Sequence, residues 1–206
     1  MKRYFVTGIG TDVGKTVVSA ILVQAGQADY WKPIQAGDLH QSDSIKVAQY
    51  IQNDISKIHP EQFRLSQPMS PHAAAEIDSV SINLTDFNIP NTLNHLIIEG
   101  AGGLLVPISE TETTADLIAS FKIPVILVSS YYLGSINHTL LTAEVLKNKN
   151  IEVVGIIYNG EENAASLRII EKLTQLKTLG KIPKTSSINH SFINQHANQF
   201  AYLFAE

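Results

Sequence analysis

A short stretch near the N-terminus contains the residue types and spacing that bind phosphate. Residues 8–16 have the sequence GIGTDVGKT. They follow the apolar run Tyr4-Phe5-Val6 and precede a segment whose apolar residues recur at the spacing of one buried helix face. A strand, a glycine-rich turn, Gly-Lys-Thr and a helix together form the context of a phosphate-binding loop. The sequence therefore predicts a P-loop at residues 8–16.

The chemistry of such a loop follows from its residue types. Glycine has no Cβ, so backbone N–H groups can approach phosphate oxygens closely. The start of the helix adds unpaired N–H groups and the positive end of the helix dipole. Lys15 can then reach the outer phosphates, and the Thr16 hydroxyl can ligate magnesium. The spacing departs from the strict motif, because five residues rather than four separate Gly8 from Gly14. The alternative is a glycine-rich strand-to-helix turn without a ligand.

Three further charged residues stand where they could serve the same chemistry. Lys32 follows a short apolar segment, and Glu99 ends the apolar run Leu96-Ile97-Ile98, where a buried carboxylate needs a partner. A magnesium ion shared with Thr16 would supply that partner, and Asp43 could be a third oxygen ligand. Each has a simpler alternative: Lys32 could be a surface lysine, Glu99 a capping or salt-bridging acid, and Asp43 part of a Ser-Asp-Ser helix start.

Alternating strands and helices must position these residues. We expect strands at 2–7, 29–34, 96–100, 124–129, 151–158 and 179–182, and helices at 14–26, from 42, and at 113–121, 136–148, 163–176 and 190–205. We expect a loop at 35–38, loops and short helical pieces at 52–71, and a glycine turn at 100–103. The buried side of the helix at 136–148 should contain Ile136, Leu140, Leu141, Val145 and Leu146. The pattern predicts one α/β domain over residues 1–206, a P-loop NTPase-like three-layer sandwich with a mainly parallel central sheet flanked by helices.

Composition narrows the function further. The chain has 206 residues, 44% hydrophobic and 17% charged residues, and a formal net charge of −4 without a long basic run, so no nucleic-acid partner is expected. It has no cysteine, which excludes disulfides and thiolate chemistry. No apolar segment is long enough for a signal peptide or a membrane span, so we expect a cytoplasmic protein and no membrane partner. The histidines show no metal-binding spacing, and His72 and His138 are expected to be structural.

An ordered set of segments makes the sequence more specific than its P-loop. The set comprises Tyr4–Gly8, Thr11–Thr16, Lys32-Pro33, Ser42-Asp43, Ser70-Pro71-His72, Glu99–Gly103, Pro124–Val128, Leu133–His138, Asn159 and Ile182-Pro183. Over nearly its whole length the chain resembles the dethiobiotin synthetase family. The resemblance implies an ATP- and magnesium-dependent ligase whose substrates are 7,8-diaminopelargonic acid and carbon dioxide. A carbamate would attack the γ-phosphate to give a carbamic–phosphoric anhydride, and the second amine would then close the cyclic urea.

The same resemblance assigns site residues. It implies Thr16, Asp43 and Glu99 as magnesium ligands and Lys32, Lys15 and Thr11 as catalytic residues. It implies nucleotide contacts from Asp12, Val13, Gly14, Lys15, Thr16, Val17, Glu99, Gly100, Ala101, Gly102, Asn159, Gly160, Pro183, Lys184 and Thr185. It implies substrate contacts from Lys32, Ala36, Gly134, Ser135 and Asn137, the last three contributed by the partner subunit of a homodimer. Two positions depart from the family: Ala36 stands where a small hydroxylated residue is common, and Gly160 follows Asn159.

Two other classes remain open at this point. A partition-type ATPase would commonly have a second lysine five residues before the P-loop lysine, but this chain has Gly10 there. A catalytically idle nucleotide-binding subunit could keep Lys15 yet would need neither Lys32 nor Asp43. Product formation from the diamine would separate both classes from the ligase.

Overall fold

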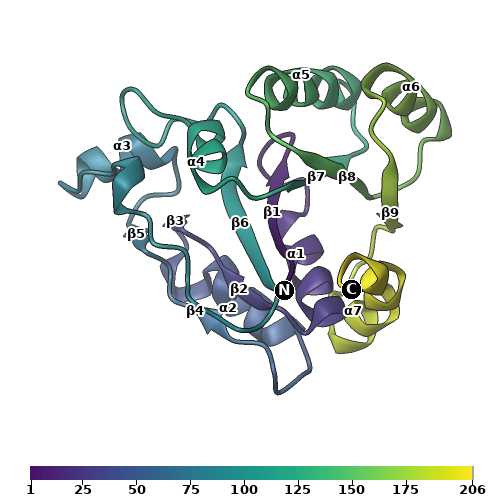
Figure 1. Cartoon of the computed structure of the whole chain (residues 1–206), viewed down its shortest axis with the longest axis horizontal. Helices are drawn as coiled ribbons and strands as arrows, with labels where there is room; N and C mark the ends of the chain where they lie inside the picture. Colours follow the sequence, from purple (N-terminus) through teal and green to yellow (C-terminus); the bar gives the residue numbers. More distant parts are fainter. Residues whose placement is uncertain (206) are drawn as a thin grey trace.

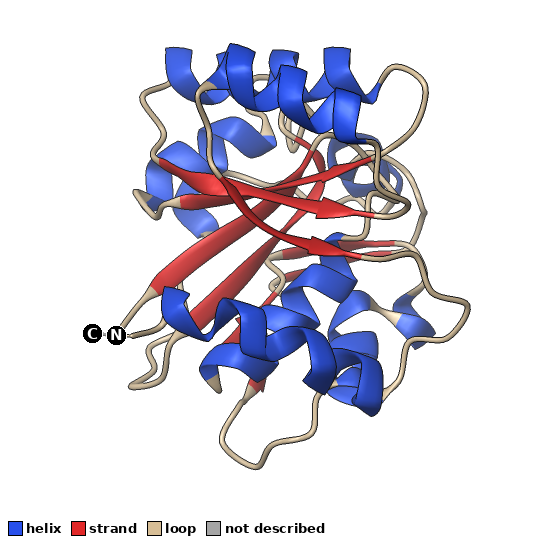
Figure 2. Cartoon of the chain, turned by 90° about the vertical axis from the view of Figure 1, so that its right-hand side faces the viewer, coloured by secondary structure: helices blue, strands red, loops and turns tan. Residues whose placement is uncertain are grey.

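The computed structural model describes residues 1–205 and shows helices packed on both faces of a parallel sheet (Figures 1 and 2). The main sheet consists of β1 (Arg3–Gly8), β2 (Asp29–Trp31), β4 (Ile58–His59), β6 (Leu96–Gly103), β7 (Val125–Ser130), β8 (Val153–Asn159) and β9 (Thr178–Ile182). Its strand order is β4-β2-β6-β1-β7-β8-β9, and every neighbouring pair is parallel. The predicted fold class is confirmed.

Seven α-helices connect or flank these strands within the described residues. They are α1 (Lys15–Gly26), α2 (Asp43–Tyr50), α3 (Pro71–Ile77), α4 (Thr114–Phe121), α5 (Ser135–Asn148), α6 (Ala164–Thr174) and α7 (His190–Ala197). None of them is long and apolar enough to cross a bilayer. In Figure 1, α5 and α6 lie together beside β8 and β9, while α7 lies next to α1.

Alternation along the central strands divides the interior into two cores. Tyr4 and Val6 of β1 belong to the core that also contains α1, α2 and α7, whereas Phe5 points into the core beneath α3 and α4. On β6, Ile97 lies in the first core and Ile98 in the second. Side chains on a strand alternate between faces, so a sheet with two covered faces needs continuous apolar runs. The same alternation fixes the face on which Glu99 lies.

Several local predictions were wrong. The predicted strand 29–34 ends as β2 at Trp31, and β3 (Ile34–Ala36) extends into the predicted loop at 35–38. β3 pairs in parallel with β5 (Phe63–Leu65) as a second, two-stranded sheet. Residues 52–70 contain the short strands β4 and β5 and no helix. The predicted glycine turn at 100–103 is instead the end of β6, because the segment continues its ladder with β1 as far as the pairing of Gly8 with Gly103. Glycine permits a turn, but the parallel neighbour satisfies the backbone here.

Two helix predictions also need correction. The C-terminal segment 190–205 is not one helix, because α7 ends at Ala197 and a 3₁₀ helix, η3 (Asn198–Leu203), follows it. On α5 the buried residues are Ser135, Thr139, Thr142 and Leu146, whereas Leu141 is 58% exposed. Helical spacing alone placed Leu141 on the buried side. The helix is instead rotated so that small hydroxyl residues face the sheet, where Thr139 bonds Ser129 of β7 at 2.9 Å.

Candidate active site

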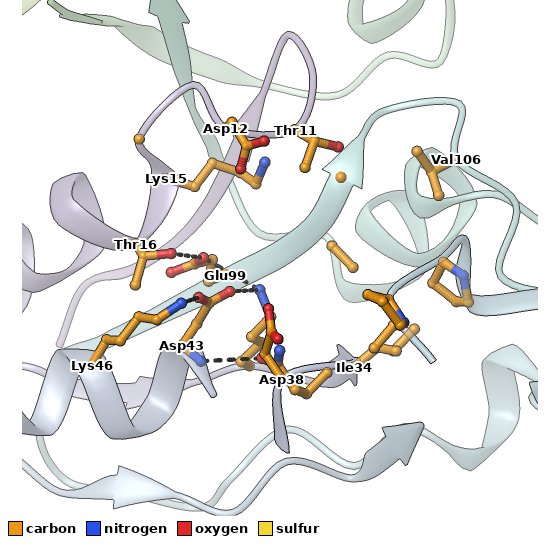
Figure 3. Close-up of a pocket in the computed structure, with 18 of the residues that line it drawn as sticks. Thr11, Asp12, Lys15, Thr16, Ile34, Asp38, Asp43, Lys46, Glu99 and Val106 are labelled. Carbon is orange, nitrogen blue, oxygen red and sulfur yellow. Dashed lines mark hydrogen bonds and ion pairs between the residues drawn. The ribbon is translucent and has the colours of Figure 1, made fainter. Parts of the chain in front are cut away.

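A cavity of about 820 Å³ opens at the carboxyl ends of β1, β2 and β6 (Figure 3). This edge is where ligands bind in open parallel α/β sheets. Twelve of the predicted site residues line it, namely Thr11, Asp12, Gly14, Lys15, Thr16, Val17, Lys32, Ala36, Asp43, Glu99, Ala101 and Gly102. Gln35, Asp38, Lys46, Met69 and Val106 also line it, although no sequence pattern singled them out.

The P-loop leaves the start of α1 open toward this cavity. Gly14 is the N-cap of α1, and it makes no side-chain capping bond, so the first N–H groups of the helix receive no side-chain cap. The Lys15 ammonium donates to the Gly10 carbonyl over 2.7 Å, which folds the lysine back along its own loop. Burial lowers the pKa of Lys15 to about 8, although the nearby Glu99 carboxylate acts in the opposite direction.

Gly14 of the P-loop packs against Asn159, the last residue of β8. Its φ is +92°, and a Cβ placed there would lie 2.0 Å from Nδ2 of Asn159. The same Nδ2 donates to the Val13 carbonyl over 3.1 Å, so Asn159 at the end of β8 fastens the P-loop. Only glycine allows both this backbone conformation and this approach.

The end of β9 lies beside Asn159. The register pairs Asn159 with Ile182, and the Gly160 N–H donates to the Ile182 carbonyl over 2.9 Å. The exposed turn formed by Pro183, Lys184 and Thr185 follows directly. The structure therefore brings the predicted nucleotide contacts at residues 159–160 and 183–185 together beside the P-loop. None of them lines the 820 Å³ cavity itself.

A buried lysine between two carboxylates forms the centre of the cavity. Lys32 is 4% exposed, and its ammonium lies 2.6 Å from Oδ2 of Asp43 and 3.3 Å from Oε1 of Glu99. Lys46 approaches the other Asp43 oxygen at 3.4 Å (Figure 3). The surface-lysine alternative for Lys32 is therefore wrong. The salt-bridging alternative for Glu99 agrees with the geometry, because the carboxylate does pair with Lys32.

Lys32 and Asp43 influence each other's protonation. Burial on its own would lower the pKa of Lys32, but Glu99 and Asp43 outweigh it and hold the pKa above its usual value. Burial would likewise raise the pKa of Asp43, yet the Lys32 ammonium holds it below its usual value. Lys32 and Asp43 are thus both charged near neutral pH.

Strand alternation explains why Lys32 and Glu99 meet. The parallel register pairs Tyr30 of β2 with Ile97 of β6 and Trp31 with Ile98. Lys32 and Glu99 each stand two positions beyond Tyr30 and Ile97, so all four side chains belong to the α1 face of the sheet. On that face the Thr16 hydroxyl of α1 donates to Oε1 of Glu99 over 3.0 Å.

Asp43 reaches the cluster from the start of α2. Ser42 is the N-cap, and its hydroxyl accepts from the Ile45 N–H at 3.4 Å, while the Asp43 carboxylate points to Lys32. Gln35 fixes the turn by accepting the Asp43 N–H at 3.2 Å. The capping role predicted for the Ser-Asp-Ser sequence therefore belongs to Ser42, which leaves the Asp43 side chain available to the cavity.

The donor set suits a magnesium ion. Two carboxylates and one hydroxyl, from Asp43, Glu99 and Thr16, face one region of the cavity, and hard oxygen donors are the ligands Mg²⁺ prefers. Within residues 1–205 no group of three His, Cys, Asp or Glu side chains could enclose a metal. Mg²⁺ is commonly bound through one or two carboxylates together with water and substrate phosphates.

The predicted substrate residues Gly134, Ser135 and Asn137 do not line this cavity. Leu133 is fully exposed, Gly134 begins α5 with φ +101°, and Asn137 lines a separate, mostly apolar groove of about 610 Å³. Ser135 is not the N-cap, since that position belongs to Gly134. His138 bonds the Tyr132 hydroxyl at 2.8 Å, as expected for a structural histidine, whereas Nδ1 of His72 is buried without a partner in the described structure.

These features define a P-loop nucleotide-binding α/β protein with a charged site beside its phosphate loop. Comparisons with known proteins give the family. A family model described as an AAA domain matches residues 2–191. ATP-dependent dethiobiotin synthetase BioD of Christiangramia forsetii is 49% identical over 205 residues, covering 100% of this chain and 99% of that protein. The protein of the same name from Cytophaga hutchinsonii is 52% identical over 198 residues, covering 96% of each. The chain belongs to the ATP-dependent dethiobiotin synthetase family.

More distant solved structures share the fold alone. The cell division ATPase MinD of Pyrococcus furiosus is 15% identical and superposes with a TM-score of 0.58, covering 98% of this chain and all of that one. A septum site-determining protein MinD from Pyrococcus horikoshii, solved with Mg-ADP, gives a TM-score of 0.58 at 13% identity, with 98% of this chain and 92% of that chain covered. Both likenesses support the α/β fold with its parallel sheet.

The contact between Gly14 and Asn159 gives a prediction about the loop itself. Replacing Gly14 with alanine forces a left-handed conformation on a residue with a Cβ and pushes Asn159 away from Val13. We expect the free energy of unfolding to fall by at least about 2 kcal/mol. The matched control is Gly10→Ala, because a Cβ on Gly10 meets no atom within 4 Å. Urea unfolding without nucleotide gives the free energy of unfolding of both variants. Equal values would contradict the constraint that Asn159 places on position 14.

Proposed function

We propose that this protein is an ATP- and Mg²⁺-dependent ligase that closes the ureido ring of dethiobiotin from 7,8-diaminopelargonic acid and carbon dioxide. The observation that carries the proposal is the buried Lys32 held by Asp43 and Glu99 beside the P-loop. Relatives covering the whole chain are named ATP-dependent dethiobiotin synthetases. A cytoplasmic location belongs to the same proposal, because ATP is supplied there.

The P-loop supplies the phosphate end of the site. Its free helix N–H groups and Lys15 bind the β- and γ-phosphates of ATP, and Thr11 and Asp12 border the same cavity. Thr16, Asp43 and Glu99 would hold magnesium, which when bound neutralises phosphate charge. Asn159, Gly160 and the Pro183–Thr185 turn would contact adenine, which their adjacency across β8 and β9 supports.

The proposed reaction has three steps. One substrate amine adds to carbon dioxide and loses a proton, giving a carbamate anion. A carbamate oxygen then attacks the γ-phosphorus, ADP departs, and a carbamic–phosphoric anhydride remains. The second amine attacks the carbamoyl carbon, loses a proton and expels phosphate, which closes the cyclic urea. The protein contributes mainly positioning and compensating charge, as phosphoryl transfer requires.

In the second step, the Lys32 ammonium would offset the repulsion between two anions. An anionic carbamate must approach an anionic phosphate, and their repulsion is strong where water is scarce. A lysine ammonium has three N–H donors, and the contacts with Asp43 and Glu99 occupy two. The third can face the carbamate, so the carboxylates both hold the ammonium in place and leave it a free donor.

The other wall of the cavity suits the rest of the substrate. Ile34, Ala36, Pro68, Met69 and Val106 give it an apolar surface beyond the charged cluster. An aliphatic chain that carries a diamine at one end would be desolvated favourably there. Ala36 contributes only a methyl group, so its side chain cannot supply the hydrogen bond that a hydroxylated residue would.

The competing classes fit these features less well. A partition-type ATPase shares the fold, but this P-loop has Gly10 where such loops commonly have a lysine. An idle nucleotide-binding subunit gives no reason to bury Lys32 against two carboxylates, since burying charges costs free energy. The ligase proposal accounts for both features.

The direct test is an ADP-release assay with purified protein, MgATP and bicarbonate, with and without 7,8-diaminopelargonic acid. We expect release to depend on the diamine, with dethiobiotin detected by mass spectrometry in equal amount to ADP. Equal ADP release without the diamine would instead favour a generic ATPase. No release under either condition, with ATP still bound, would favour the idle subunit.

The role of Lys32 gives a second test. Lys32→Gln removes the ammonium but keeps a hydrogen-bond donor, so we expect ATP binding to persist and diamine-dependent turnover to fall by roughly 10²-fold or more. The control is Lys149→Gln, which removes a lysine paired with Asp116 far from the cavity. Turnover of Lys32→Gln equal to that of the control would remove Lys32 from the mechanism.

Assembly is a further part of the proposal. We infer a homodimer in which the turn at Leu133–Asn137 of one subunit binds the substrate carboxylate in the other. Exposed apolar residues support it, because Leu141 and Leu173 line the apolar groove and Leu133, just before α5, is fully exposed. No side chain caps the start of α5, and the N-terminus of a helix suits an anionic carboxylate.

We expect Leu141→Glu to shift the protein toward monomer in light scattering and to weaken diamine-dependent turnover, because a charge would be buried in the interface. The control is Leu93→Glu, at an 88% exposed residue outside the groove. A wild-type protein that is monomeric at working concentration and fully active would rule out the shared site.

A further inference from the structure

The buried Tyr30 contacts Glu99, a proposed Mg²⁺ ligand. It does so through the carboxylate oxygen that Thr16 and Lys32 do not contact. The Tyr30 hydroxyl donates to Oε2 of Glu99 over 2.9 Å, and both side chains are almost completely buried. The other oxygen, Oε1, accepts from Thr16 at 3.0 Å and from Lys32 at 3.3 Å. The two oxygens of one carboxylate therefore have different partners, and only Oε1 is shared with Thr16 and Lys32, which line the cavity.

The register of the sheet places Tyr30 for this contact. Tyr30 pairs with Ile97 of β6, and Glu99 is the next residue on the same face. A phenol extends far enough along the sheet to reach a carboxylate one residue pair away, which a shorter side chain at this position could not do. The backbone pairing thus fixes the relative positions of the hydroxyl and the carboxylate.

The bond restricts the carboxylate in a way that packing alone does not. The terminal torsion of a glutamate side chain is broad and rotates easily. A donor fixed on Oε2 holds the carboxylate plane, so that Oε1 keeps its position toward Thr16 and the P-loop.

Other tyrosines with buried hydroxyl groups show that burial alone does not require a carboxylate as hydrogen-bond partner. The hydroxyl groups of Tyr131 and Tyr158 have no hydrogen-bond partner among the described residues. Tyr4 does bond, but to the Leu203 carbonyl at 2.7 Å, on the side of the molecule occupied by η3. Tyr30 differs from all three because its partner is a charged group of the candidate site.

We propose that Tyr30 is a positioning residue that orients Glu99 as a metal ligand by holding Oε2 and presenting Oε1. The inference rests on the proposed function, since it requires Glu99 to bind Mg²⁺. Hydrogen bonds of this kind, made to the ligand rather than to the metal, typically change metal affinity by roughly 10- to 100-fold when they are removed.

The test is Tyr30→Phe, which removes one oxygen and keeps the ring in the core. The probe is Mn²⁺, titrated into a mixture of a non-hydrolysable ATP analogue and an excess of protein. Electron paramagnetic resonance measures the concentration of free Mn²⁺. We expect Mn²⁺ to bind Tyr30→Phe roughly 10-fold or more weakly than wild type. The matched control is Tyr4→Phe, which also loses one buried tyrosine hydrogen bond and should keep wild-type Mn²⁺ affinity.

The variant Glu99→Gln tests the proposed metal-binding role of Glu99 separately from the positioning role of Tyr30. If Glu99→Gln weakens Mn²⁺ binding while Tyr30→Phe binds like Tyr4→Phe, the positioning role is overturned and the metal site stands. If Glu99→Gln binds Mn²⁺ like wild type, the metal role of Glu99 fails and the inference fails with it. Combining Tyr30→Phe with Glu99→Gln should weaken binding no further than Glu99→Gln alone, because the hydroxyl acts through that carboxylate. A further additive loss would contradict the proposal.

Discussion

The site depends on the ion pairs that Lys32 makes with Asp43 and Glu99. All three groups are removed from water to a large extent, and breaking such a pair by removing one partner typically costs about 3–5 kcal/mol. The same contacts are a weak source of net stability, because desolvation offsets most of the attraction. The arrangement places a cation next to the phosphate loop. In the proposed mechanism, such preorganised charge would favour an anionic transition state without further rearrangement.

The parallel sheet provides the geometry that the ion pairs need. Lys32 and Glu99 come from neighbouring strands, whose register sets their spacing, and Thr16 lies on the helix packed over the same face. Asp43 is positioned independently, through the Ser42 cap and the bond from its N–H to Gln35. The site is therefore assembled from secondary-structure ends rather than from one flexible loop. Groups held in this way keep their separations better than groups on loops.

The sequence predicts the parts of this architecture that depend on local pattern. Continuous apolar runs identified the central strands, and the residues that end them identified Lys32 and Glu99. It did not predict β3 and β5, because short strands pair with distant residues and carry little periodicity. It misplaced Leu141 on the buried side of α5, since helical spacing does not reveal which side faces the sheet. Tyr30 was overlooked for a similar reason: as part of an apolar strand it appeared to be core, although its alternation with Lys32 placed it on the site face.

Asn159 shows how the two ends of the nucleotide site are coupled. Its amide bonds the Val13 carbonyl, and the space it needs exists only because residue 14 is glycine. Gly160 then bonds the end of β9, from which the Pro183 turn departs. A displacement of the P-loop would thus alter the contacts of Asn159, and through the β8–β9 ladder the turn beside it. Glycine at position 14 consequently serves two purposes, since it lets backbone N–H groups approach phosphate and leaves room for the Asn159 side chain at the end of β8.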